Sequence, residues 1–171
     1  RSDDNTFAGG NIGSVNIDNN GTITLTTSDN WIGYGDTLHG PYIVSKTPIS
    51  ITAGSKVSFD WSAISTDDAF DVYGYLVDVD SGSSINLLNE TAGGSTSSSV
   101  FQSKEVTVAS EGNYKMVFVS GSFDSTYGGL VGANLSLKNI SITTGNSLLH
   151  ITATSDQTLA EGQLDFSNKN L

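Results

Sequence analysis

The chain has 171 residues, about the length of one domain and enough to enclose a single hydrophobic core. Its 18 acidic and 7 basic residues give a formal net charge of −11, which argues against nucleic acid as a partner. Cysteine is absent, so a disulfide scaffold and a thiolate metal site are excluded, and any bound cation needs oxygen ligands. No apolar run approaches the ~18 residues of a membrane span, so we expect no membrane insertion.

The residue types and their spacing predict an all-β chain. Most of the acid is Asp, which favours turns and caps where Glu favours helices. A hairpin is expected over residues 16–25, around Asn20 and Gly21. Further strands are expected over residues 56–62, 70–79, 85–88, 101–108, 114–120 and 134–143, with loops over residues 28–42, 90–99 and 121–132.

The alternation of apolar and polar side chains indicates how these strands pack. In residues 56–62 it places Val57, Phe59 and Trp61 on one face, toward a core. In residues 70–79 both faces carry apolar side chains, as in a central strand of a sandwich. We therefore predict an antiparallel β-sandwich, jelly-roll-like, with long acidic and Gly-rich loops at one end.

Chain direction predicts which loops share an end of the sandwich. Short connections in an all-β chain require successive strands to run antiparallel, so every second connection emerges at the same end. The loops expected together span residues 63–69, 90–99 and 121–133, and the tight turns expected at the opposite end lie near Gly54, Gly82 and Gly112. Loops gathered at one end commonly carry the function of such a fold.

Acidic side chains are concentrated in two of these loops. Asp67, Asp68 and Asp71 lie close together at the start of a strand, and Asp124 lies in a loop expected beside them. Like charges this close raise each other's pKa unless a cation lies among them, and Ca²⁺ takes roughly six to eight oxygen ligands from such groups. The acids are therefore either calcium ligands or solvated turn residues, and spacing alone does not decide.

Other kinds of site fit the sequence less well. Residues 78–82 resemble the start of an EF-hand loop, but Asn89 stands where the ligating Glu belongs and no helices flank it, so we predict a hairpin turn. His39 and His150 lack the spacing of a zinc site. There is no GxSxG elbow for a hydrolase, and although Asp67 and Asp124 can be paired as glycosidase carboxylates, we expect no enzyme.

Three segments of the chain together resemble a known family. They are Phe59-Asp60-Trp61-Ser62, residues 67–75 (DDAFDVYGY), and residues 119–133 (VSGSFDSTYGGLVGA). In this order they resemble the peptide-binding domain of giant RTX adhesins, which Gram-negative bacteria export by type I secretion. The resemblance covers roughly residues 7–143. It divides the chain into a ligand-binding domain over residues 1–145 and a segment, 146–171, that either closes that domain or begins the next module.

The resemblance implies a calcium-dependent β-sandwich at the surface of a Gram-negative bacterium. It implies that Ca²⁺ engages the free carboxylate at the C-terminal end of a peptide on a host or partner cell, without catalysis, and that other adhesin domains neighbour this one in the chain. The implied calcium ligands are Asp67, Asp68, Asp71, Asp124, Ser122, Gly128 and Gly129. Residues expected to wall the peptide pocket are Tyr127, Leu130 and Val131.

Two further interpretations remain open at this point. A calcium-dependent lectin shares the sandwich and the Asp pair, and Trp31, Tyr34 and Tyr42 would then be a sugar-stacking platform rather than core residues. Alternatively, the chain is a spacer module in which calcium only stiffens a tandem array of domains.

Overall fold

The computed structural model describes residues 13–66, 68–92, 98–126, 129–154 and 165–170. The described residues form β-strands joined by turns, and none forms a helix long and apolar enough to cross a membrane. The strands are β1 (Gly13–Ile17), β2 (Ile23–Ile32), β3 (Thr37–Val44), β4 (Ile49–Ile51), β5 (Lys56–Ser65), β6 (Ala69–Asp78), β7 (Ser84–Ala92), β8 (Ser98–Thr107), β9 (Gly112–Phe123), β10 (Gly129–Thr144), β11 (Ser147–Thr154) and β12 (Asp165–Asn170).

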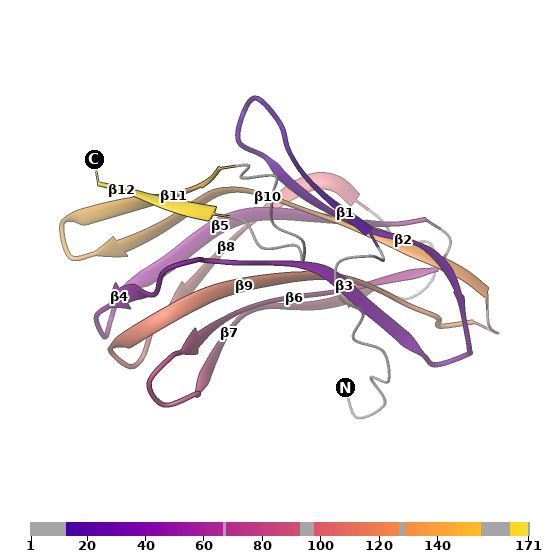
Figure 1. Ribbon diagram of the computed structural model, residues 1–171, viewed down its shortest axis with the longest axis horizontal. Helices are drawn as coiled ribbons and strands as arrows, with labels where there is room; N and C mark the ends of the chain where they lie inside the picture. Colours follow the sequence, from indigo (N-terminus) through magenta and orange to yellow (C-terminus); the bar gives the residue numbers. More distant parts are fainter. Residues whose placement is uncertain (1–12, 67, 93–97, 127–128, 155–164, 171) are drawn as a thin grey trace.

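The strands make two antiparallel sheets that pack face to face, as the two layers in Figure 1 show. One sheet is built around β10, which pairs with β2 and β11 and, along its other edge, with β5; β1 and β8 flank β2 and β5, and β12 pairs with β11. The second sheet runs in the order β3, β9, β6, β7, with β4 beside β9. The predicted antiparallel β-sandwich is confirmed.

Inward-facing side chains of both sheets fill the space between the layers. Phe59 of β5 meets Phe118 of β9 edge to face, with ring centroids 5.2 Å apart, and neither is more than 1% exposed. The alternation in β5 orients Val57, Phe59 and Trp61 toward this core, as the sequence predicts. The two rings join the layers near the middle of the core.

The predicted sorting of loops and turns is also confirmed for the described residues, and residues 93–97 of the loop expected over 90–99 lie outside them. The connection after β5 meets the start of β10, where Thr66 N donates to Gly132 O at 3.0 Å, and the connection before it, where Ser125 N donates to Asp68 Oδ2 at 2.8 Å. We call this end, on the right in Figure 1, the loop end. At the opposite end Val79 N donates to Asn113 O at 2.9 Å, which brings the β6–β7 and β8–β9 turns together. Asp78 Oδ1 accepts hydrogen bonds from the Asp80 and Ser81 amides, so residues 78–82 form the predicted hairpin turn.

The strands at the loop end are longer than the sequence predicts. Residues 28–42, expected to be a loop, belong largely to β2 and β3. The irregularity falls inside β3, where the register shifts between His39 and Tyr42 around a cis Gly40–Pro41 peptide. Thr27 Oγ1 donates to Gly40 O at 2.6 Å across the interior. Glycine and proline signal a break in local structure, but here β9 and β10 supply backbone partners that hold the segment extended.

The last strands continue the first sheet. β11 pairs with the end of β10, from Ser141 opposite His150 to Thr144 opposite Ser147, and β12 pairs with β11. Ile151 of β11 is 5% exposed and packs in the common core. The described part of residues 146–171 therefore shares a sheet with the preceding strands.

Candidate functional site at the loop end

Backbone hydrogen bonds tie three connections together at the loop end. Asp124, which follows β9, lies beside the turn between β2 and β3. Its backbone N donates to Asp36 O at 3.0 Å, and its backbone O accepts from Gly35 N at 3.0 Å. The segment between β5 and β6 approaches from the other side through Asp68. Asp124 is thereby enclosed on both sides.

The Asp68 carboxylate is held by the residues that follow Asp124. Asp68 Oδ2 accepts from Ser125 N at 2.8 Å and from Thr126 N at 3.2 Å. The Ser125 and Thr126 hydroxyls donate to the same carboxylate. Burial raises the pKa of Asp68, but these hydrogen bonds outweigh it and hold the pKa below its ordinary value. Asp68 is therefore a fixed carboxylate at neutral pH.

The Asp124 carboxylate lies directly beside that of Asp68. Thr126 N, which donates to Asp68 Oδ2, also donates to Asp124 Oδ1 at 3.0 Å. The other oxygen, Asp124 Oδ2, is buried and has no hydrogen-bond partner, and the same holds for Ser122 Oγ two residues earlier. Both residues are 0% exposed. We call Asp68, Ser122 and Asp124 the loop-end cluster.

The electrostatics of the loop-end cluster favour a cation. Among the described residues, no ion pair involves Asp68 or Asp124. A buried carboxylate oxygen without a donor or a cation is costly, because it has lost its water without replacement. Gly129 borders the orphaned oxygen, since a Cβ added there would stand 3.9 Å from Asp124 Oδ2. A small cation with oxygen ligands would compensate the buried charge.

The acids do not all converge on one point. Among the described residues, no group of three or more His, Asp or Glu side chains is placed to hold a metal. The cluster has one unpartnered carboxylate oxygen, one unpartnered hydroxyl and the Asp68 carboxylate, whose oxygens already accept hydrogen bonds. A calcium ion there would therefore need further oxygens from backbone carbonyls, water or a ligand. The residues fit calcium with open positions better than a closed structural site.

Asp71 is separate from the loop-end cluster. It lies on the outer face of β6, where Oδ2 accepts from His39 Nε2 at 2.8 Å and from Tyr73 Oη at 3.0 Å. Oδ1 accepts from Thr91 Oγ1. Asp71 is 0% exposed, and its three partners lie on β3, β6 and β7, so it belongs to a buried polar network on this outer face and not to the acids beside Asp124. His150 lies in the other sheet, on β11, which separates the two histidines.

Of the remaining predicted site residues, some lie outside the described residues and others lie within the sheet. Asp67, Tyr127 and Gly128 lie outside the described residues. The backbone of Leu130 pairs with Trp31 in the sheet. Val131 is only 1% exposed, so it belongs to the packed interior rather than to an open pocket wall.

Sequence reasoning missed Asp36, Ser125 and Thr126. The backbone of Asp36 fixes Asp124, and the other two residues hold Asp68. Polar residues directly after an Asp commonly form local hydrogen bonds with it, so the sequence Asp124-Ser125-Thr126 could have indicated a role for Ser125 and Thr126. Asp36 carried no comparable signal, because its contact with Asp124 depends on the sheet.

Two aromatic side chains are exposed at the same end. Trp31 at the end of β2 is 78% exposed and Tyr34 in the β2–β3 turn is 69% exposed. Tyr42 lies elsewhere, on the outer face of β3 opposite Val119. The three aromatics therefore do not form a single platform, although Trp31 and Tyr34 remain available to a ligand at the loop end.

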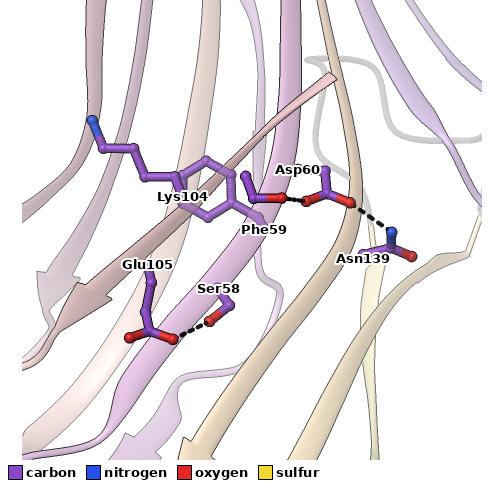
Figure 2. A pocket seen from close by; sticks show the side chains of 7 residues that line it. Ser58, Phe59, Asp60, Lys104, Glu105 and Asn139 are labelled. Carbon is purple, nitrogen blue, oxygen red and sulfur yellow. Dashed lines mark hydrogen bonds between the residues drawn. The ribbon is translucent and has the colours of Figure 1, made fainter. Parts of the chain in front are cut away.

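A polar pocket on the outer face of β5 and β8 has a different character. Asp60 lies between two donors, Ser103 Oγ at 2.6 Å and Asn139 Nδ2 at 2.7 Å. Figure 2 shows Asp60 beside Asn139. Ser58 Oγ donates to Glu105, which also pairs with Lys56. Both Asp60 oxygens have partners, and Asn139 sits at the register shift of β10 with φ of 54°. The network pins this irregular part of β10 and is structural.

The Asp60 network predicts that the stability of the fold depends on pH. The hydrogen bond from Ser103, followed by that from Asn139, lowers the pKa of Asp60. A lowered pKa in the folded state gives stability that is present above the unfolded-state pKa of about 3.9 and is lost as pH falls through the folded-state pKa. We expect Asp60→Asn to melt below the wild type at pH 7 and to lose less melting temperature on acidification. Ser103→Ala should show the same trend more weakly, and equal acid sensitivity of all three proteins would contradict it.

Comparison with known proteins identifies no family. No protein-family model and no curated protein matches the chain. Among solved structures, the chain is similar to one described as "Structure of infectious bursal disease virus Gx strain", with 11% identity and a TM-score of 0.39 over 80% of this chain and 33% of that chain. The chain thus spans about a third of the length of that viral chain.

Proposed function

We propose that this chain is a calcium-dependent ligand-binding module, and that its ligand is the C-terminal end of a peptide or protein. Asp68 and Asp124 would hold the ion, with Ser122 and the backbone near Gly129 as further oxygen donors. The observation that carries the proposal is the buried Asp124 Oδ2, which has no partner and lies beside a second carboxylate. Calcium, when bound, would supply positive charge and open positions that accept a carboxylate.

Charge explains why a cation is needed for such a ligand. The chain has a formal net charge of −11, and the loop end carries Asp29 and Asp36 in addition to the cluster. A peptide carboxylate approaching this surface would be repelled unless a cation lay between. Asp68 and Asp124 would orient the cation, while exposed Trp31 and Tyr34 flank the approach and offer apolar contact to the last side chains.

The resemblance to the peptide-binding domain of RTX adhesins supports the same assignment. On that basis the module would act outside the cell, on the surface of a Gram-negative bacterium, as one domain of a longer adhesin and without catalytic activity. Its partners would be proteins on host or microbial cells. Modest affinity would suffice there, because many copies on a surface bind together.

One observation favours a second candidate, a calcium-dependent lectin. Trp31 and Tyr34 are exposed beside the acidic cluster, and exposed aromatic rings can stack on sugars as well as on peptides. A spacer module remains the interpretation in which calcium stabilises the fold and no ligand binds.

Peptides differing only at their C-terminus test the proposal. A library of peptides with free carboxylates is screened in calcium, and each binder is then compared with its C-terminally amidated form and with a glycan panel. We expect binding only of the free-carboxylate form, and loss of binding in EDTA. Binding that survives amidation would contradict carboxylate capture. Glycan binding would favour the lectin. Stabilisation of the fold by calcium without binding of any ligand would favour the spacer module.

Asp68→Ala is expected to weaken ligand binding and calcium stabilisation together, because one carboxylate of the pair is lost. Asp80→Ala is the matched control, since Asp80 is an exposed acid in the β6–β7 turn at the opposite end. Calorimetric titration with calcium, with and without peptide, measures both effects. If the calcium affinity of Asp68→Ala is unchanged, the ion binds elsewhere.

A further inference from the structure

The outer face of the β3-β9-β6-β7 sheet carries tyrosines and valines among its polar side chains. The outer face of β5, by comparison, is polar at Ser58 and Asp60. In β9, Val117 and Val119 point outward and are only 7% and 4% exposed, although no third layer of described residues covers them. Something on the same face must cover these valines.

Tyrosines from the neighbouring strands provide the cover. Tyr42 of β3 and Tyr73 of β6 both stand opposite Val119, and Tyr75 stands opposite Val117. Tyr75 is close to Tyr42 as well: burial, followed by the charge of the Tyr42 phenol, raises the pKa of Tyr75. We call Tyr42, Tyr73 and Tyr75 the tyrosine face.

A shallow pocket of about 190 Å³ opens where the tyrosine face meets the edge strand β7. The register of β6 and β7 shifts between Gly74 and Tyr75, so Tyr73 stands opposite Asn89 and Tyr75 opposite Asn86. The pocket is thus lined by two tyrosines and two exposed asparagines, together with Gly74, Ser84 and Leu88. No charged side chain lines it.

The Tyr73 ring is fixed before any ligand arrives. Its hydroxyl donates to Asp71, and its ring meets the His39 ring edge to face, with centroids 4.9 Å apart. His39 is itself held by Asp71 at 2.8 Å. The buried network therefore orients an aromatic surface, which lowers the entropy lost when a ligand packs on it.

We propose that the pocket formed by Tyr73, Tyr75, Asn86 and Asn89 is a second binding site, which accepts a neutral sugar ring of a glycan without calcium. Aromatic rings pack on the C–H face of a sugar, and amides donate to and accept from its hydroxyls. An acidic glycan does not fit, because the pocket offers no cation and the chain has a formal net charge of −11. The pocket's volume of about 190 Å³ is that of a site for one small ring and not for a long ligand segment.

Titration with defined oligosaccharides, followed through backbone amide NMR signals, tests this site. The probes are cellohexaose, laminarihexaose and mannohexaose, with hexagalacturonate as the acidic comparison. We expect at least one neutral probe to shift the signals of residues 73–75 and 84–89, equally in calcium and in EDTA. Under the proposed function EDTA removes the ion from the loop end and leaves this pocket in place, so sugar binding in EDTA distinguishes the second site from the peptide site.

Variants assign the binding to side chains. Tyr75→Ala and the pair Asn86→Ala and Asn89→Ala should each weaken binding about tenfold, the value of one aromatic or polar contact. Val100→Ala, at an exposed position on β8 of the other sheet, should leave it unchanged, and Tyr75→Phe should keep ring packing if Tyr75→Ala fails to fold. The proposal is overturned if no neutral probe shifts these signals, if hexagalacturonate binds better, or if the face instead mediates self-association that Tyr75→Ala abolishes.

Discussion

Asp124→Asn is expected to reverse the order of stability between calcium and EDTA. In EDTA the wild type keeps a buried charged oxygen without a partner beside the Asp68 carboxylate. An amide of the same shape is also unpartnered there but carries no charge, so it removes the repulsion between the two carboxylates. The variant should therefore melt at or above the wild type in EDTA. In saturating calcium the wild type should melt higher, because ion binding adds about 2.7 kcal/mol at a concentration one hundred times the Kd.

Thermal melts of both proteins across a calcium series measure this crossover. Asp80→Asn is the control, because that exposed acid in the opposite turn should follow the wild type in both conditions. For a chain of this length, 1 kcal/mol corresponds to about 2–4 °C, so the crossover is measurable. If the melting temperatures of the wild type and Asp124→Asn change in parallel across the calcium series, the cation does not bind at the loop-end cluster.

Asp71→Ala is expected to destabilise the chain to the same extent with and without calcium. Its carboxylate accepts from His39, Tyr73 and Thr91, and removal leaves three buried or half-buried donors without their acceptor. Loss of one partner from such a buried network costs about 3–5 kcal/mol. Urea unfolding should show the same loss of unfolding free energy in calcium and in EDTA.

Thr91→Val provides the graded comparison for Asp71. It removes one donor and keeps the carboxylate, so the expected loss is smaller, about 1 kcal/mol. If the loss in Asp71→Ala appears only in calcium, Asp71 is a ligand of the ion and its network with His39 is secondary. Asp71→Ala should also weaken the binding of a neutral sugar at the second site, because Tyr73 would lose its fixed orientation.

The alternation of side chains predicted the core, and chain direction predicted the loop end. Phe59 and Trp61 alternate with polar residues, so their burial follows from the two-residue period of a strand. Asp68 and Asp124 are 56 residues apart, and antiparallel order alone brings their loops together. Asp71 was grouped with them because it is near Asp68 in the chain. A strand turns it to the outer face, where His39 meets it.

By itself, the sequence determined the fold class and the end of the sandwich at which the acids gather. Both follow from local pattern and the direction of successive strands, which are properties of the chain. Only the tertiary structure decided which acids already have partners: Asp71 is satisfied by two other strands, whereas Asp124 Oδ2 is enclosed without a donor. Whether a buried oxygen has a partner depends on side chains from distant segments, and no local pattern in the sequence specifies them.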